Sequence, residues 1–529
     1  MLTLALLKIQ HIGKGWYLMA RNHVEEFRED LKEFHEMTKK FYQKEITVPE
    51  YKSFSGGFGS YAQRGGERSM LRLRLAGGEL NKEKLKFVAD SISKYNIDLV
   101  HFTTCQSIQV HNLTEASVCG LVEEAFDHGI ITRGGGGDFP RNVMCSPLSG
   151  VQEDEYFDPL PYAKEAGDYL LGFIKKVKLP RKLKVCFTNS EKNETHATFR
   201  DLGFVAKENQ TFDVYAAGGL GIKPKMGVCV AKDVEPSKIL YYIKTMIDVF
   251  TEHGNYTNRA ASRTRFLQDT LGVEGFINVY QEKLAHNLEN EKLDINVKAE
   301  VINKTGDGEI SNPRIIKQKQ KGLFAVSYHP IGGNPKPEFF KNIYEVISNM
   351  KDVKLRISPD QGVYVINLTA VEAQKVLECT KDGASTLFER STACVGATIC
   401  QVGIGKSQAL LDACIERVRQ ENFKDGVLPA IHISGCPSSC SAHQIGRLGF
   451  RGGKKPTQDG SKFAFAVYED GCELLGAENF GKEMGVIIED DIPEFLVDLG
   501  KEVTSLGVTY EEYRKKYPEN LAKLAAKYI

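Results

Sequence analysis

The chain has no long apolar segment and no excess of charge. None of its hydrophobic runs approaches the roughly 20 residues that cross a bilayer, and 69 basic residues balance 69 acidic ones. These absences exclude a polybasic tail for nucleic acid or for an anionic membrane surface. The opening segment MLTLALL is too short for a signal peptide and lacks a cleavage site. We expect a cytoplasmic protein with no membrane or nucleic-acid partner, in which residues 1–18 are an ordinary N-terminal segment or Met19 is the true start.

Cysteines and cofactor-binding motifs are also few. Twelve cysteines in 529 residues are too few for a disulfide scaffold. Eight of them are scattered, and most are expected to be small buried hydrophobes, whereas the other four fall within a 47-residue window. The Gly-rich turns at 133–138 and 216–221 lack the G-x-G-x-x-G spacing of a dinucleotide site. The sequence shows no flavin or nicotinamide motif and no C-x2-C-x2-C ferredoxin run.

Two stretches of the chain repeat the same pattern at a constant offset of 255. Each contains an alternating strand that ends in a glycine pair, then a helix, then a strand pair that ends in Leu-Thr. We interpret the repeat as an internal duplication, which favours a pseudo-twofold pair of half-domains with a site between them. The coinciding residues are Gly77–Gly78 with Gly332–Gly333, Gln106 with Gln361, and Leu113–Thr114 with Leu368–Thr369.

A chain of this length is expected to form two to four domains. Apolar residues recur at helical spacing over 21–45. The duplication then predicts an N-terminal helical segment (1–50), a first half-domain (51–124), a larger α+β region (125–318), a second half-domain (319–384) and a cysteine-bearing region (385–529).

The strongest chemical signal is the group of four clustered cysteines. Cys394 and Cys400 form a C-x5-C pair, and Cys436 and Cys440 form a C-x3-C pair. Four thiolates can hold the four irons of a cubane cluster, and glycines with Pro437 suit loops that bend closely around it. A structural zinc site usually has C-x2–4-C pairs, so the wider gap fits it poorly. Spacing favours iron–sulfur over zinc and over unconnected core cysteines.

The pattern C-x5-C…G-C-P-x-x-C resembles the signature of the sirohaem-containing nitrite and sulfite reductases. The likeness covers roughly residues 51–500 and includes a G-x-Y-x-Q-R segment at 59–64, the T-T-x-Q strand, RNVMCSP at 141–147, LPRKLK at 179–184 and AGGLG at 217–221. It implies an α+β fold with duplicated ferredoxin-like half-domains and two larger α/β domains that bind sirohaem and an iron–sulfur cluster.

The resemblance also implies a function. Cys394, Cys400, Cys436 and Cys440 would hold a [4Fe–4S] cluster, and Cys440 would also bind the sirohaem iron. The reaction would be the multi-electron reduction of a small oxyanion, sulfite to sulfide or nitrite to ammonia. An external donor such as ferredoxin or a flavoprotein would supply the electrons.

Sirohaem carries eight carboxylates and the substrate is an anion, so such a site needs cations in a poorly solvated cavity, and the reduction needs proton donors. By resemblance, Arg141, Lys182 and Lys184 are assigned to the anion pocket as catalytic residues, and Arg64 and Arg181 to cofactor binding. Strand alternation would place the two lysines on one face. A short basic run is otherwise usually a solvated strand edge.

The chain departs from the family at two positions. Cys105 replaces the arginine of T-T-R-Q, and a thiol cannot bind an oxyanion as a guanidinium does. Arg64 or Arg133 would then fill the gap, or the substrate is less charged, or turnover is slow. Cys105 itself is a candidate cofactor-facing thiol, redox-active or ligating. Ser438 stands where the family commonly has asparagine.

Two alternatives remain at this point: an electron-transfer protein that has lost oxyanion turnover, or a reductase of another small substrate. The sequence does not separate sulfite from nitrite. His432 and His443 flank the cluster loop and are expected to be hydrogen-bonded structural residues.

Overall fold

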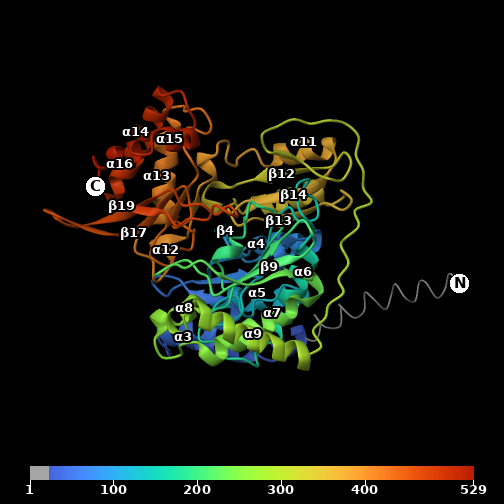
Figure 1. Cartoon of the computed structure of the whole chain (residues 1–529). Coiled ribbons are helices and arrows are strands. Elements are labelled where there is room, and N and C mark those ends of the chain that lie inside the picture. Colours follow the sequence, from blue (N-terminus) through green and yellow to red (C-terminus); the bar gives the residue numbers. More distant parts are fainter. Residues whose placement is uncertain (1–22) are drawn as a thin grey trace.

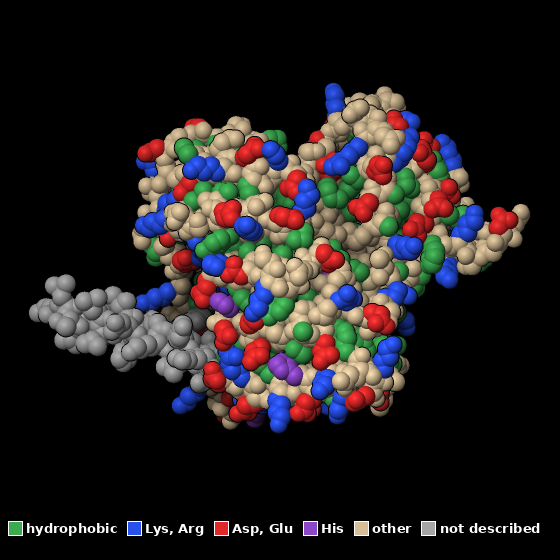
Figure 2. Space-filling model, turned by 180° about the vertical axis from the view of Figure 1, so that it is seen from behind, with side chains coloured by type: hydrophobic (Ala, Val, Ile, Leu, Met, Phe, Trp, Pro, Cys, Tyr) green, Lys and Arg blue, Asp and Glu red, His purple; other side chains and the backbone are tan. Residues whose placement is uncertain are grey.

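The computed structural model describes residues 23–529, so the expectations for residues 1–18 and Met19 lie outside the described residues. Four sheets, each covered by helices, make up the molecule (Figure 1). The predicted α+β fold with duplicated half-domains is confirmed. No helix among residues 23–529 is both long and apolar enough to cross a membrane. Acidic and basic side chains are interspersed over the face that Figure 2 shows.

The first half-domain is an antiparallel sheet with strand order β1-β2-β5-β4. Strands β2 and β4 both flank β5, and helix α4 connects them as a split β-α-β unit. Thr114 caps α5 in a capping box with Ser117. The elements are β1 (Ser60–Ala62), β2 (Ser69–Leu73), α4 (Lys82–Lys94), β4 (Val100–Phe102), β5 (Ile108–Leu113) and α5 (Glu115–Asp127).

The second half-domain repeats this arrangement and borrows a strand from the first. Its sheet has the order β11-β12-β14-β13-β3, in which β3 comes from the first copy and pairs with β13. This exchange fastens the two half-domains together. The elements are β3 (Glu79–Leu80), β11 (Ile315–Lys317), β12 (Phe324–Tyr328), α10 (Glu338–Ile347), β13 (Lys354–Ile357), β14 (Val363–Leu368) and α11 (Ala370–Cys379).

The residues that coincide in the two copies have the same backbone conformation. Gly77 and Gly332 have φ of +62° and +61°, a region open to glycine without a Cβ penalty. Gln106 and Gln361 also have positive φ, at 53° and 65°. Each glutamine side chain then bonds both backbone groups of one residue in the neighbouring sheet, Cys145 for Gln106 and Ala393 for Gln361. The repeated glutamine therefore connects two neighbouring sheets through a pair of hydrogen bonds in each copy.

The two large sheets are also copies of each other, which the sequence analysis did not predict. Both begin with two parallel pairings and continue with two antiparallel pairings, in the orders β6-β7-β8-β9-β10 and β15-β16-β17-β18-β19. The strands of the first are β6 (Met144–Cys145), β7 (Val185–Thr188), β8 (Leu202–Ala206), β9 (Phe212–Ala216) and β10 (Val228–Val234). Those of the second are β15 (Thr392–Ala393), β16 (Ile431–Ser434), β17 (Leu448–Thr457), β18 (Gly460–Glu469) and β19 (Lys482–Ile488).

Helices cover both large sheets in corresponding places. The first sheet has α6 (Leu160–Leu171), α7 (Ile239–His253), α8 (Leu267–Thr270) and α9 (Val273–Asn290). The second has α12 (Gly396–Ile399), α13 (Ser407–Arg419), α14 (Ile492–Ser505), α15 (Tyr510–Lys516) and α16 (Asn520–Ala525). Beyond the covered part of its sheet, the β17–β18 hairpin projects from the body, at the left of Figure 1 and the right of Figure 2.

The N-terminal helical segment differs from its prediction. The described part of the expected helix over 21–45 breaks at residues 29–30 before α2 (Leu31–Tyr42), and α3 (Val48–Ser55) follows. At this break, the Asp30 carboxylate pairs with Arg133 and Lys175. Phe34 of α2 is fully buried against the first half-domain, as the helical spacing predicted.

Candidate cofactor and anion site

The two cysteine loops lie side by side because they follow adjacent parallel strands. Cys394 comes directly after β15, and Cys436 and Cys440 come after β16. The carboxyl ends of parallel strands meet at one edge of a sheet. The Gly435 amide donates to Cys394 Sγ at 3.2 Å, and its carbonyl accepts from Ile404 N and Gly405 N at 2.9 and 2.8 Å. Both loops are therefore held in register.

Glycine is required where these loops touch. A Cβ on Gly435 would lie 2.7 Å from the Gly405 carbonyl oxygen, and one on Gly452 would lie 2.6 Å from the Gly435 carbonyl oxygen. Real Cβ atoms do not approach backbone this closely, so a side chain here would push the loops apart. The base of the β17–β18 hairpin, which contains Gly452, is therefore packed directly against the cysteine loops.

The thiols at this edge affect one another. The pKa of Cys440 is raised to about 12, chiefly by desolvation and then by the Cys394 and Cys436 thiols, while Lys182 and Lys184 oppose the shift. Burial likewise raises the pKa of Cys394. Such thiols need a positive centre to ionise, and bound iron provides one.

The donor set has the chemistry of an iron–sulfur site. Among residues 23–529, no three His, Cys, Asp or Glu side chains gather in a way that would hold one metal ion. In a cubane each of four thiolates binds a different iron at a separate corner. Four cysteines on two glycine-lined loops are a set that fits it.

Arg64, expected at the cofactor, contacts the cysteine loop itself. Its Nη2 donates to the carbonyls of Cys400 at 3.1 Å and Gly403 at 2.8 Å, and its backbone N donates to Ile399 O at 2.8 Å. The first half-domain reaches the other loop through Thr104, whose Oγ1 donates to the Cys440 carbonyl at 2.7 Å. Both contacts position the loops that carry the thiols.

Lys182 and Lys184 lie together next to Cys440. They flank Leu183, which is fully buried and forms a parallel bridge with Pro140, so the alternation predicted for a strand is present. Burial holds the pKa of Lys182 well below its usual range, with Lys184 adding repulsion, while Cys440 opposes the shift. Burial also lowers the pKa of Lys184. Both lysines are half-buried, and holding two ammonium groups side by side away from bulk water is costly without a counter-anion, which is the expected property of an anion pocket.

The two arginines predicted for this site have protein partners. Arg141 donates to the Gly135 and Gly137 carbonyls at 2.9 and 2.8 Å, which leaves its buried Nε without a partner in the described chain. Arg181 pairs with Asp138. Asp138 also pairs with Arg259 at 2.8 Å, so its single negative charge is shared by two arginines, and the assignment of Arg181 to sirohaem carboxylates stays a prediction.

Sequence reasoning missed two arginines that join this pocket. Arg263 pairs with the buried Asp201 at 2.8 Å and contributes to the lowered pKa of Lys182. Arg200 contributes to the lowered pKa of Lys184. The alternating R-T-R over 263–265 is a signal that could have revealed Arg263, whereas no comparable pattern surrounds Arg200.

Cys105 lies against the same cations. Burial would raise its pKa, but the Lys184 ammonium and then the Arg200 guanidinium lower it to about 6. Arg133 does not fill the place of the missing arginine, because it pairs with Asp30 at 3.2 Å and lies over the Phe58 ring. The pocket thus gains a thiol that favours the anionic form where a cation was expected.

Polar groups around the second cysteine loop are only partly paired. His432 Nδ1 lies 2.8 Å from the Ser441 carbonyl oxygen. His443 is fully buried and neither of its ring nitrogens has a partner in the described chain, so its expected hydrogen bond is wrong. Burial lowers the pKa of His443 to about 3. The hydroxyls of Ser439 and Ser441 are likewise buried and unpaired.

The AGGLG turn packs on this loop. Gln444 accepts from Gly221 N at 2.7 Å and donates to Gly221 O at 2.9 Å. A cavity of about 350 Å³ separates this turn from Pro437 and Tyr468. The unpaired polar groups of Ser439, Ser441 and His443, with this cavity beside Pro437 of the same loop, fit a large polar macrocycle.

The copied sheet contains a second loop of the same shape without cysteine. At an offset of 246, Cys436 falls on Ser190 and Cys440 on Glu194. The backbone repeats: the positive φ of Ser439 (52°) recurs at Asn193 (48°). At the earlier offset of 255, Cys105 falls on Asp360, and the Asp360 charge contributes to the raised pKa of Glu194. Each half therefore has the same pair of positions, and only one half fills them with thiols.

Comparisons with known proteins agree with this geometry. Residues 61–125 match the "Nitrite/Sulfite reductase ferredoxin-like half domain" and residues 136–288 match the "Nitrite and sulphite reductase 4Fe-4S domain". The chloroplastic ferredoxin–nitrite reductase of Arabidopsis thaliana is 23% identical over 465 residues, 84% of this chain and 78% of the relative. The ferredoxin sulfite reductase of Mycobacterium tuberculosis is 24% identical over 436 residues, 78% of this chain and 75% of the relative.

A solved structure, the NirA protein of Mycobacterium tuberculosis, superposes with a TM-score of 0.72 at 22% identity and covers 89% of both chains. At this identity the likeness establishes the fold alone. Taken together, the two matched domains, the relatives and the shared fold show that the chain belongs to the nitrite and sulfite reductase family of oxidoreductases.

Proposed function

We propose that this protein reduces a small oxyanion, sulfite or nitrite, in the cytoplasm with electrons from an external donor such as ferredoxin. A [4Fe–4S] cluster on Cys394, Cys400, Cys436 and Cys440, together with a sirohaem that shares Cys440, would supply the electron chemistry. The observation that carries the proposal is the position of Lys182 and Lys184, whose charges act directly on Cys440.

The residues of the chain bind and orient the anion. Lys182 and Lys184 provide two positive charges without a carboxylate partner in the described chain, although Lys184 contacts the Cys105 thiol. In a poorly solvated cavity each such charge interacts more strongly than in water. Arg263 differs, because Asp201 already holds it, so it adds to the field without being free to move.

Proton supply is a second task of the same pocket. The lowered pKa of Lys182 means that this ammonium gives up its proton more readily than a solvated lysine. A group with a pKa brought toward neutrality is suited to general acid catalysis. Lys182 is thus proposed both to bind the anion and to donate protons to its oxygen.

Cys105 bears on which anion is used. A thiol whose pKa is about 6 carries a negative charge at pH 7 and reduces the positive field near Lys184. The singly charged nitrite ion is penalised less by this change than the doubly charged sulfite ion. Nitrite is therefore the favoured substrate of the two.

Steady-state reduction of nitrite and of sulfite by the anaerobic holoenzyme with reduced dye tests the proposal. Lys182→Gln should retain the cofactor spectrum and lower kcat/KM at least about tenfold, which corresponds to about 1.4 kcal/mol. Lys178→Gln is the control, since Lys178 is an exposed lysine of the preceding segment. Cofactors without turnover of either anion in the unmodified protein would instead favour an electron-transfer role.

A further inference from the structure

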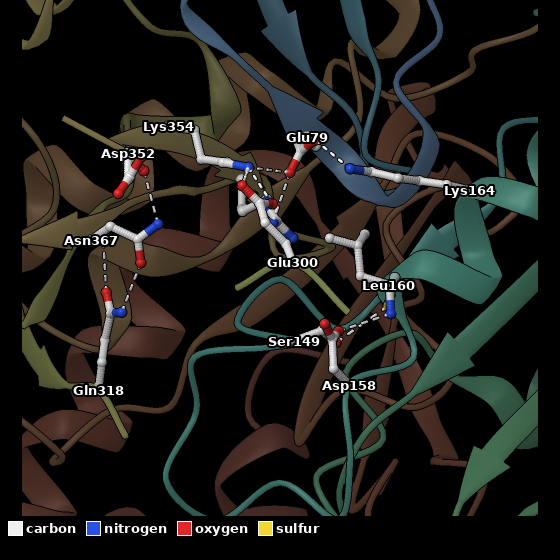
Figure 3. A network of polar contacts seen from close by, with 12 residues as sticks. Glu79, Ser149, Asp158, Leu160, Lys164, Glu300, Gln318, Asp352, Lys354 and Asn367 are labelled. Carbon is white, nitrogen blue, oxygen red and sulfur yellow. Dashed lines mark hydrogen bonds and ion pairs between the residues drawn. The ribbon is translucent and has the colours of Figure 1, made fainter. Parts of the chain in front are cut away.

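A second cavity lies away from the cysteine loops, where three segments meet. One wall is the loop 149–151 with the start of α6, another is the extended strap 296–302, and the third is the β13–β14 pair. Its volume is about 220 Å³. We refer to it as the strap cavity (Figure 3). None of the residues assigned to oxyanion reduction lines it.

The strap is fixed on both sides of this cavity. Ile295 N donates to the Ser237 carbonyl at 3.0 Å. Lys304 Nζ donates to the Asn367 carbonyl at 2.7 Å and to Glu372 at 2.6 Å. The segment between these anchors has no secondary structure of its own, so it forms a tethered cover.

A buried cluster of charges forms the floor. Glu79 pairs with Arg356 at 2.8 Å, with Lys354 at 3.3 Å and with Lys164. Lys354 also pairs with Glu300 of the strap at 2.6 Å. Figure 3 shows Lys354 and Lys164 reaching Glu79 from opposite sides. With Lys298 and Asp158, which also line the cavity, four cations face three carboxylates, which leaves one positive charge.

Arg356 has buried donors that a bound anion could satisfy. It lines the cavity and is 3% exposed. Its Nη2 pairs with Glu79, but Nε and Nη1 have no hydrogen-bond partner in the described chain. Buried guanidinium donors are normally paired, so an acceptor with negative charge fits here.

Apolar side chains also line the cavity, next to the polar Ser149, Asn296 and Asn367, and the volume limits the ligand's size. Val151, Leu160, Val297, Ile302 and Ile366 line the cavity. Because a cavity of about 150 Å³ holds benzene, this one accommodates on the order of nine non-hydrogen atoms. An inorganic oxyanion would leave the apolar walls uncovered.

We propose that the strap cavity binds a small organic carboxylate, with its carboxylate on Arg356 and its hydrocarbon body against Val297 and Ile366. Asp158, on the cavity wall, accepts from Leu160 N at 3.0 Å. Burial raises the pKa of the Asp158 carboxyl, which reduces its repulsion of a bound carboxylate. The geometry sets this site apart from the oxyanion pocket, and its occupancy is independent of the proposed reduction.

Calorimetric titration of the full-length holoenzyme with isovalerate tests the site. A ligand of this size should bind once per chain with a Kd on the order of 1 mM. Isovaleramide, which lacks the charge, and sulfate, which lacks the hydrocarbon, should bind at least about tenfold more weakly. Arg356→Gln should weaken isovalerate to a similar extent.

Because Arg356→Gln also removes a partner of Glu79, a second pair of variants keeps all charges. Val297→Trp fills the cavity from the strap and should abolish binding. Val301→Trp adds the same bulk on the same strap at a position that is 76% exposed, and should bind as the unmodified protein does. Absence of saturable heat with isovalerate, or equal binding by the two tryptophan variants, would overturn the proposal.

Discussion

Replacing Glu194 by glutamine should remove a pH-dependent cost of folding. Burial first, and then the nearby Asp360 charge, raise the pKa of Glu194 from 4.5 to about 7. Its Oε2 has no hydrogen-bond partner in the described chain. Glu194 holds the position that Cys440 occupies in the other copy, so the variant also probes the cysteine-free loop.

The sign follows from proton linkage. Below about pH 4.5 the carboxyl is protonated in the folded and unfolded states, and the shift costs nothing. As pH rises toward 7 the unfolded state ionises first, so folding loses stability, and above 7 the full cost is present. A shift of about 2.5 pKa units corresponds to about 3.4 kcal/mol. Between pH 5.5 and 8.5 the expected change is about 2 kcal/mol at most, less where water reaches the carboxyl.

Native-state hydrogen exchange of the β7 and β8 amides measures the local opening free energy that this argument concerns. The unmodified protein should lose protection in these strands relative to Glu194→Gln as pH rises from 5.5 to 8.5, after correction for intrinsic exchange. Glu191→Gln, an exposed carboxylate in the same loop, is the matched control and should behave like the unmodified protein. Equal protection of all three proteins at both pH values would refute the reasoning.

Three further predictions concern the cysteine loops and the anion pocket. Gly435→Ala should lower the iron and sulfide content of the purified protein, because its Cβ would lie 2.7 Å from the Gly405 carbonyl oxygen. Gly453→Ala is the control: the atom nearest to its Cβ is 4.0 Å away, so the iron and sulfide content should be unchanged. Gln361→Leu should destabilise the fold by about 1–3 kcal/mol and loosen the cluster, since it leaves the buried Ala393 N unpaired, although the Ala393 carbonyl keeps its bond from Gln408; full iron retention and an unchanged melting temperature would contradict this. Cys105→Arg should raise kcat/KM for sulfite more than for nitrite, because it replaces a thiol of low pKa with a cation; a loss with both anions would count against the pocket assignment.

The duplication of the half-domains could be predicted from the sequence because the residues that match between the copies have structural roles. Gln106 and Gln361 each hook one sheet to the next, and the glycine pairs occupy a backbone region that other residues disfavour. Such residues tolerate few replacements. Pattern and spacing therefore sufficed to find this duplication.

The duplication of the large sheets stayed hidden for the opposite reason. Cys436 and Cys440 correspond to Ser190 and Glu194, so the chemistry that made one loop conspicuous is absent from the other. What the copies share is backbone geometry, such as the left-handed residues Ser439 and Asn193. Geometry of this kind leaves no residue-type signal in a single sequence.

The candidate site was predictable in its cysteines and lysines but not in its arginines. Arg181 carries charge in the sequence, yet in the fold it shares the Asp138 carboxylate with Arg259. Arg263, 62 residues from its partner Asp201, arrives only through long-range packing. Which cations remain free is a property of tertiary structure, and composition cannot reveal it.

The central claim is that the four cysteines hold a cluster beside a sirohaem. Anaerobically purified protein should contain close to four acid-labile sulfides and about five irons per chain, with a sirohaem absorption spectrum. Cys436→Ser should lose the sulfide and most of the iron, whereas Cys414→Ser, which removes a buried core thiol of the same domain, should keep both. A colourless protein that contains zinc, or Cys436→Ser with an unchanged sulfide content, would contradict the account.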